Sequence, residues 1–348
     1  MMNLALLIPF ALSLGGTALY RRYASFAGLL DVPNSRSSHT IPTPRGAGSV
    51  FASVFLVSLG VMTALARLPV AYAVAVIGSA GLVAVIGWLD DRRGLSAGFR
   101  LVAHAFSAIW AVAWISPTTL SFGAISVTSV PLARVLFALL AVWSVNMFNF
   151  MDGIDGLAAG EAVTVSLFAA LLSLSIGDFS VMPSYLTMAS VLLGFLIWNW
   201  APARVFMGDV GSGFLGMVFA CSAMWSSAHG SLPLATWGIL LSVFFVDAAF
   251  TLIRRVILRE RIWEAHRSHA YQLAVLAGFP HKTVALTVML VDSCLLPIAW
   301  FSVRYPEQGW MAAGFVFLVL GGIQVALTRR WSYLWRRQVA KPTFPQTM

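Results

Sequence analysis

The sequence is poor in charge. Only 10% of its 348 residues are Asp, Glu, Lys or Arg, whereas 59% are hydrophobic and the mean hydropathy is +0.85. Soluble domains typically carry roughly 25% charged residues. No long polar segment, internal repeat or low-complexity region interrupts the chain. The composition therefore excludes an ordinary soluble domain and predicts an all-α, polytopic integral membrane protein that forms one domain over residues 1–348.

Cysteine is also scarce, and the N-terminal segment has no basic residue ahead of its apolar run. Cys221 and Cys294 both lie inside apolar runs, so no disulfide framework is indicated. Arg21 and Arg22 follow the first apolar run instead of preceding it. We therefore expect this run to be a membrane span and not a secretory signal peptide.

Apolar runs long enough to cross a bilayer, roughly 17–25 residues each, recur along the chain. They predict eleven transmembrane helices, at residues 3–20, 47–66, 70–89, 99–116, 132–150, 157–176, 183–199, 213–228, 235–253, 284–302 and 310–328. With the first helix running from outside to inside, every other connection faces the cytoplasm. The cytoplasmic segments are then 21–46, 90–98, 151–156, 200–212, 254–283 and the tail after 328.

The basic residues support this topology. Of the 22 Lys and Arg residues, 19 lie in or beside the segments expected to face the cytoplasm, as the positive-inside rule requires. Orientation and contact with anionic lipid explain the formal net charge of +9, so nucleic acid is not expected as a partner.

The acidic residues carry more information about function. Nine of the 13 share the cytoplasmic side, although the positive-inside rule does little to place acids. They are Asp31, Asp90, Asp91, Asp152, Asp155, Glu161, Asp209, Glu260 and Glu264. A common site on that face would explain why they gather there.

The run GWLDDRRG places Asp90 and Asp91 at the end of the third predicted helix. One alternative is a solvated helix end. Adjacent carboxylates repel each other, however, and the neighbouring Arg92 and Arg93 relieve this only partly. A divalent cation, or a proton shared with a substrate, would relieve it better.

The stretch NFMDGIDGLAAG follows the fifth predicted helix and lacks the ligand spacing of an EF-hand. Four polar residues spaced by three run into it: Asn146, Asn149, Asp152 and Asp155. Gly153 and Gly156 allow the chain to leave helical geometry, so that these groups can converge. The alternative is an N-cap for the next helix, which would explain only one of the two carboxylates.

The segment FMGDVGSGFLG frames Asp209 with Gly208, Gly211 and Gly213 ahead of another span. Free N–H groups at a helix N-terminus can bind phosphate. The segment is not a Walker loop, because no Lys follows the glycines. A simple loop is the alternative.

The largest cytoplasmic loop, 254–283, contains His266 and His269 with Arg267 between them. There is no HExxH motif and no nearby Cys pair, so zinc is not favoured. Basic and imidazole donors beside acidic clusters favour phosphate binding, and contact with lipid headgroups is the alternative. Within predicted spans, Asp247 is an intramembrane carboxylate without an assigned role, and Asp292 has no nearby motif.

Together these segments resemble the family of polyprenyl-phosphate N-acetylhexosamine-1-phosphate transferases, which is related to the phospho-N-acetylmuramoyl-pentapeptide transferases. The matching segments, in the family's order, are DVPNSRSSHTIPTPRGAG at 31–48, the DD pair at 90–91, NMFNFMDGIDGLA at 146–158, FMGDVGSGFLG at 206–216 and AHRSHAYQ at 265–272. The resemblance covers nearly the whole chain.

The resemblance implies a Mg²⁺-dependent reaction, with Mn²⁺ as a possible substitute. A lipid phosphate attacks the β-phosphorus of a UDP-N-acetylhexosamine and releases UMP. Asp209 is the implied metal ligand, and Asp90 or Asp91 would orient or deprotonate the lipid phosphate. A phosphate monoester has a second pKa near 6, so it is largely dianionic at neutral pH, and positioning or metal binding is an alternative role for that pair.

The resemblance also implies roles for the remaining site residues. Asp152 and Asp155, with Asn149, would shape the nucleotide and metal pocket. The implied catalytic residues are Asp90, Asp91, Asp152, Asp155, His266 and His269. The implied substrate-binding residues are Asn149, Arg267, Arg36, His39, Arg45 and Asn199.

The implied substrates are a polyprenyl (undecaprenyl) phosphate and a UDP-amino sugar, in a bacterial inner membrane and with a homodimer possible. Muramoyl-pentapeptide enzymes carry consecutive histidines where this chain has HRSHAYQ, which favours a simple amino sugar. The form looks closest to enzymes that start O-antigen synthesis, with GlcNAc, FucNAc or QuiNAc left open. The muramoyl-pentapeptide reaction stays the alternative.

A secondary transporter is the rival class. Its sites usually lie near the bilayer midplane in broken helices, often between internal repeats. Here the polar clusters gather at one face and no repeat is visible, which favours the enzyme.

Overall fold

The computed structural model describes residues 2–33, 41–123, 125–261 and 266–339, and nearly all of its regular structure is helical. The helices are α1 (Met2–Phe26), α2 (Gly48–Ala64), α3 (Val70–Arg93), α4 (Ala97–Ile115), α5 (Val130–Met151), α6 (Leu157–Ser175), α7 (Met182–Asn199), α8 (Gly208–Ala228), α9 (Leu234–Leu240), α10 (Ser242–Ile257), α11 (Ala270–Leu276), α12 (His281–Arg304) and α13 (Pro306–Val339). The strands β1 (Leu30–Asp31) and β2 (Thr43–Pro44) form one antiparallel hairpin, and β3 (Leu120–Phe122) and β4 (Ile125–Val127) form another.

The all-α membrane architecture predicted from composition is confirmed. Within the described part of the chain, eight helices are long and apolar enough to cross a bilayer: α3, α4, α5, α6, α7, α8, α12 and α13. Each of the eleven predicted spans coincides with a helix or a helix pair, but α2 has only 17 residues. The count of eleven therefore stays a prediction.

The predicted span at 235–253 is not one straight helix. It consists of α9 and α10, which meet at an angle of 79°. Leu241 joins them with a non-helical backbone at φ −103° and ψ 11°. Hydropathy records the length of an apolar run but not its direction, so the sequence did not reveal this bend.

Helix α8 is the most buried of the eight membrane-length helices. Glycines make this possible, because small residues let helix backbones approach closely in a membrane. A Cβ on Gly216 would collide with the backbone of Ser144 on α5. A Cβ on Gly87 of α3 would lie 2.5 Å from the backbone of Asp209. Close packing against α3 and α5 thus sets the position of the first turn of α8.

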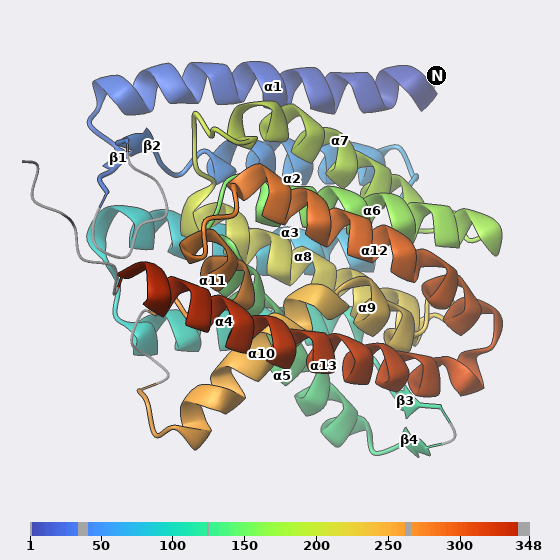
Figure 1. Cartoon of the computed structure of the whole chain (residues 1–348). Helices are drawn as coiled ribbons and strands as arrows, with labels where there is room; N and C mark the ends of the chain where they lie inside the picture. The colour runs from blue at the N-terminus through green and yellow to red at the C-terminus, as the bar shows by residue number, and fades with distance from the viewer. Residues whose placement is uncertain (1, 34–40, 124, 262–265, 340–348) are drawn as a thin grey trace, which may run out of the picture.

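The helices run roughly along one direction, so that the bundle has two ends (Figure 1). The β1–β2 hairpin lies at one end, and the β3–β4 hairpin lies at the other together with the N-terminus. Backbone hydrogen bonds join the first loop to the segment before α8, from Phe206 N to Pro44 O at 2.8 Å and from Ala47 N to Phe206 O at 3.1 Å. Polar segments far apart in sequence therefore meet at the β1–β2 end.

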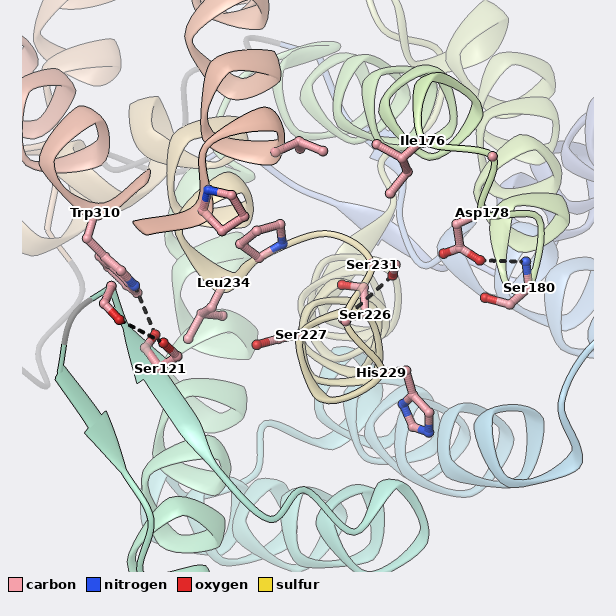
Figure 2. Close-up of a pocket in the computed structure, with 16 residues that line it drawn as sticks. Ser121, Ile176, Asp178, Ser180, Ser226, Ser227, His229, Ser231, Leu234 and Trp310 are labelled. Carbon is pink, nitrogen blue, oxygen red and sulfur yellow. Dashed lines mark hydrogen bonds between the residues drawn. The ribbon is translucent and has the colours of Figure 1, made fainter. Parts of the chain in front are cut away.

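A cavity of about 640 Å³ lies at the β3–β4 end (Figure 2). Asp178, His229 and Trp310 are among its lining residues, and the Trp310 ring nitrogen donates to Ser121 O at 2.9 Å. Its Ser227 is 18 positions after Asp209 on α8, a separation of about 27 Å at about 1.5 Å per residue. None of the predicted site residues lines this cavity.

Candidate active site

Arg45 joins the first loop to two helices. Its Nε lies 2.8 Å from Asp91 Oδ1 on α3, and its Nη2 lies 2.8 Å from Asp209 Oδ1 on α8. The Asp91 side chain is only 6% exposed. Burial opposes the charge of the guanidinium, but Asp91 and Asp209 raise the pKa of Arg45 above its ordinary value. One cation thus holds two carboxylates from different helices together.

A second arginine completes the cluster. Arg100 of α4 places Nη1 at 2.8 Å from Asp90 Oδ2 and at 3.3 Å from Asp209 Oδ2. Arg92, which follows the acidic pair in sequence, lies over the Trp88 ring at 3.8 Å. The Asp90 side chain is 8% exposed. The solvated helix end considered for this acidic pair is therefore wrong, and its charge is balanced from other elements. We define the arginine–aspartate cluster as Arg45, Asp90, Asp91, Arg100 and Asp209.

Asp91 also binds the N-terminus of α8. Its Oδ1 accepts a hydrogen bond from Asp209 N at 3.0 Å, and its Oδ2 accepts one from Val210 N at 3.3 Å. The GDVGSG stretch is the first turn of α8 and not a loop, because the helix begins at Gly208. These two N–H groups are already bonded to Asp91, so they do not form the free phosphate cradle considered from sequence.

The stretch 152–156 leaves helical geometry as the glycines predict. Helix α5 ends at Met151, and Gly156 precedes α6 with φ +73°. Gly156 is the N-cap position of α6, and no side chain caps it there. The N-cap alternative for the two carboxylates is therefore wrong. Asn199 Oδ1 accepts from Gly156 N at 3.2 Å, and its Nδ2 donates to Val205 O at 3.0 Å.

Asp155 contacts the segment after α7 and the start of α12. Its Oδ2 accepts a hydrogen bond from Ala203 N at 3.0 Å and lies 3.3 Å from His281 Nδ1. Sequence reasoning missed His281, because it stands at the start of α12 without any surrounding motif. Asp155, Asn199 and His281 thus form a neighbouring polar group, joined through the backbone of 199–205.

Asp152 differs from the other carboxylates of the site. No group in the described part of the chain donates a hydrogen bond to its carboxylate. Burial raises the pKa of Asp152 well above its ordinary value, Arg45 lowers it, and Asp209 and Asp91 raise it further. Asp152 is therefore an acceptor beside the cluster that a cation or a substrate proton can satisfy. Asn149, one turn before it, donates from Nδ2 to Ser212 Oγ at 3.2 Å.

The His266–His269 loop brings its two rings together, as the spacing predicts. The ring centroids are 4.9 Å apart with an interplanar angle of 27°. His269 is buried at 2% exposure, whereas His266 is half-buried. Burial lowers the pKa of His266 to about 4, and His269 and Arg255 lower it as well. His266 is thus the neutral, more accessible imidazole of the loop.

Three predicted substrate-binding residues remain: Arg267, Arg36 and His39. Arg267, which stands between the two histidines in sequence, is half-buried. Arg36 and His39 lie outside the described residues. Tyr271 ties the histidine loop to the end of α5, because its hydroxyl donates to Phe150 O at 2.8 Å.

The donor set at this end fits a hard divalent cation that is shared with a phosphate. Among the described residues, no three His, Cys, Asp or Glu side chains converge as a ready-made metal site. Mg²⁺ usually takes one or two carboxylates, with substrate phosphates and water as the other ligands. Among the described residues, Arg45 and Arg100 bond three carboxylates, and Asp152 lies beside them with no ion pair to either arginine. Asp209 and Asp152 are the residues best suited to such an ion.

The fold and the arginine–aspartate cluster define a polytopic membrane protein with a polar site at one end of its helices. Residues 72–227 match the family model described as glycosyl transferase family 4. The chain is 29% identical over 290 residues to the probable undecaprenyl-phosphate N-acetylglucosaminyl 1-phosphate transferase of Bacillus subtilis (strain 168). That match covers 79% of this chain and 77% of the relative.

Two further relatives have related activities. Over 348 residues the chain is 28% identical to the undecaprenyl-phosphate alpha-N-acetylglucosaminyl 1-phosphate transferase of Yersinia pestis, covering 95% of this chain and 92% of the relative. Over 183 residues it is 34% identical to the phospho-N-acetylmuramoyl-pentapeptide-transferase of Deinococcus radiodurans, covering 51% and 54%. These matches confirm the resemblance inferred from the motifs. Over most of its length the chain is thus similar to polyprenyl-phosphate sugar phosphotransferases.

Proposed function

We propose that this protein transfers an N-acetylhexosamine 1-phosphate from a UDP-sugar to polyprenyl phosphate, with Mg²⁺, giving a polyprenyl-diphosphate sugar and UMP. The arginine–aspartate cluster carries this proposal. Arg45 and Arg100 hold three carboxylates at one end of a membrane bundle, beside Asp152, to which no described residue donates a hydrogen bond. The names of the relatives support the same reaction.

The chemistry needs positioning and charge neutralisation more than a strong base. An oxygen of the lipid phosphate attacks the β-phosphorus of the donor, and the bond between the β-phosphorus and the bridging oxygen breaks, so UMP leaves with the electron pair. The attacking phosphate is already largely dianionic, since its second pKa is near 6. Asp90 and Asp91 then act by holding Arg45, Arg100 and the first turn of α8 in place.

Asp209 and Asp152 would hold the Mg²⁺ ion in this proposal. The ion, when bound, neutralises charge on the diphosphate. Asp155 and Asn199 would bind the nucleotide, because both are fixed to the 199–205 backbone beside His281. His266 and Arg267 would contact the diphosphate from the facing loop.

The site would face the cytoplasm of a bacterial inner membrane. The basic residues concentrated on the same side of the predicted topology support this orientation. We also propose the chain as the first membrane enzyme of O-antigen or a related envelope glycan, with GlcNAc, FucNAc or QuiNAc as the sugar, and a homodimer as its assembly.

The test is an assay of purified protein with undecaprenyl phosphate, Mg²⁺ and a panel of UDP-N-acetylhexosamines. Release of UMP and formation of a lipid-linked sugar are expected with at least one donor. The panel includes UDP-N-acetylmuramoyl-pentapeptide, because the Deinococcus radiodurans relative makes that reaction the second candidate. If no donor in the panel gives UMP, both candidate reactions are refuted.

Asp209→Asn gives the matched test of the site. It should abolish turnover while the folded protein is retained, because an amide cannot replace the charge that meets two arginines. Asp178→Asn, at the far cavity, is the control and should keep wild-type rates. Near-normal activity of Asp209→Asn would remove Asp209 from the metal site.

A further inference from the structure

Asp247 is the most densely bonded carboxylate in the membrane-embedded part of the molecule, although neither the motifs nor the proposed reaction assigns it a role. It lies on α10 and is 5% exposed. Its oxygens accept hydrogen bonds from three elements. The donors are His269 Nδ1 at 3.3 Å, Ala270 N at 2.9 Å, Tyr271 N at 3.2 Å, Gln324 Nε2 at 3.0 Å and Thr251 Oγ1 at 3.2 Å. Asp247 therefore ties the histidine loop to α10 and α13 at once.

His269 transmits this anchoring to the site. A carboxylate that accepts from Nδ1–H fixes both the orientation and the tautomer of an imidazole. The His269 ring lies between Phe150, whose ring centroid is 6.0 Å away, and His266, at 4.9 Å. At 2% exposure His269 has almost no surface for a substrate. Its contacts lead instead to His266 and to the end of α5 beside Asp152.

We propose that Asp247 and His269 are positioning residues, and that His266 is the imidazole of this loop that contacts substrate phosphate. The inference rests on the proposed transfer reaction. In this arrangement Asp247 holds the His269 ring, the His269 ring supports the His266 ring, and Gln324 from α13 secures the carboxylate. The sequence spacing alone treats the two histidines as equivalent, and the burial of His269 makes them different.

The test is a double-mutant cycle on kcat and KM for both substrates. Asp247→Asn should lower kcat by about 10- to 100-fold, the size found for outer partners of metal-bound histidines, with smaller changes in KM. Because Asp247 acts through His266, the Asp247→Asn/His266→Ala double variant should be no slower than His266→Ala alone. Losses that multiply in the double variant, or an unchanged kcat in Asp247→Asn, would overturn the proposal.

Two controls separate positioning from misfolding and from failure of the proposed reaction. Gln324→Met removes one donor and leaves the Asp247 carboxylate, so kcat should fall less than in Asp247→Asn. Adding Gln324→Met to His266→Ala should lower kcat no further. Trypsin cleavage after Arg267 should accelerate in Asp247→Asn, and this readout needs no activity. If Asp247→Asn is cleaved faster but the wild type releases no UMP, the positioning of the loop by Asp247 stands and the proposed reaction is refuted. If Asp247→Asn is cleaved at the wild-type rate, the positioning role is refuted.

A separate observation concerns two carboxyl groups within the membrane-spanning helices. Glu161 of α6 is fully buried, and Asp292 of α12 is 3% exposed. Helices α6 and α12 pack against each other, with Gly160, next to Glu161, against Met289, one turn before Asp292. In the described part of the chain, no donor reaches any of the four carboxyl oxygens. Two ionised carboxylates without hydrogen-bond donors at one apolar helix interface would be strongly destabilising.

We infer that Glu161 and Asp292 form a proton-binding site that holds one shared proton between α6 and α12. The O–H of one carboxyl then donates to the other. Helix α6 follows the loop of Asp155, and α12 begins at His281, which contacts Asp155. The Glu161–Asp292 pair therefore joins the same two helices farther along their length.

Infrared difference spectroscopy tests this second proposal. The spectrum of wild type minus Glu161→Gln should contain a protonated-carboxyl C=O band that shifts in D₂O, and so should wild type minus Asp292→Asn. Asp178→Asn, a carboxylate at the far cavity, should give no such difference. Absence of the band from both difference spectra would overturn the shared proton.

Discussion

Arg45 Nη2 donates a hydrogen bond to Asp209 Oδ1 at 2.8 Å, across 164 positions of sequence. The same guanidinium bonds Asp91 through Nε at 2.8 Å. The first loop, α3 and α8 are thereby held as one unit at the β1–β2 end. Asp91 strengthens this unit, because it also accepts the N–H groups that open α8.

Arg45→Lys should lower kcat by about 10²- to 10³-fold, the cost typical of removing one preorganised donor from a charged reaction centre. A lysine ammonium is a point charge and cannot reproduce the fork that meets Asp91 and Asp209 together. The measurement is UMP release with saturating substrates. Arg134→Gln, whose native side chain bonds Ser116 near the opposite end, serves as the control and should keep wild-type rates. Equal rates for Arg45→Lys and wild type would show that bridging is unnecessary.

Chelation by EDTA should abolish transfer, and added Mg²⁺ should restore it. Mg²⁺ in the presence of the UDP-sugar should also raise the thermal midpoint of the wild type, because ligands that bind only the folded state stabilise it. Asp152→Asn should lose this metal-dependent shift, since no described residue donates a hydrogen bond to this carboxylate of the site. Differential scanning measurements with and without metal check this. A metal-dependent shift in Asp152→Asn as large as in the wild type would show that Asp152 is not a ligand of the ion.

His281→Ala should raise the KM for the UDP-sugar about 10-fold, equivalent to about 1.4 kcal/mol, with a smaller effect on kcat. The substitution removes the partner that lies 3.3 Å from Asp155 Oδ2 in the proposed nucleotide pocket. Lys282→Gln, an exposed neighbour, is the matched control. A KM change confined to polyprenyl phosphate would place Asp155 and His281 with the acceptor instead.

Gly87→Ala should destabilise the protein by about 1–3 kcal/mol, the usual cost of overpacking. Its new methyl group would lie 2.5 Å from the backbone of Asp209, so α3 and α8 must separate at the active site. Activity should fall with stability. Gly60→Ala is the control, because a Cβ there meets no atom within 4 Å. Thermal unfolding of both variants distinguishes a tight helix contact from a general intolerance of alanine.

The stability of the wild type should fall as the pH is lowered from about 6.5 toward about 4, and part of this loss should come from His266. Its pKa is lowered from 6.5 to about 4, chiefly by burial, so the unfolded chain binds a proton in this interval that the folded protein does not. His266→Gln removes this difference and should lose less stability over the same interval. Thermal midpoints measured at several pH values for the two proteins provide the check, and parallel curves would contradict it.

Much of the membrane architecture and of the site's location was predictable. Apolar run length is a local property, so eight spans fell where hydropathy placed them, with α9 and α10 as the bent exception. The clustering of Asp90, Asp91 and Asp209 was also predicted, because every second connection between membrane helices lies on the same side of the membrane. Partner choice was not foreseen: Arg92 adjoins the acidic pair in sequence, yet Arg100 bonds it.

The sequence by itself determined that this is a multi-span membrane protein with acidic and histidine motifs gathered on one side, because composition, run length and motif order are read directly from the chain. The tertiary structure alone decided which groups meet. It placed Arg45 between Asp91 and Asp209, buried His269 against Asp247, and brought His281 to Asp155. Such contacts depend on how helices pack in three dimensions, and residue spacing along one chain does not contain that information.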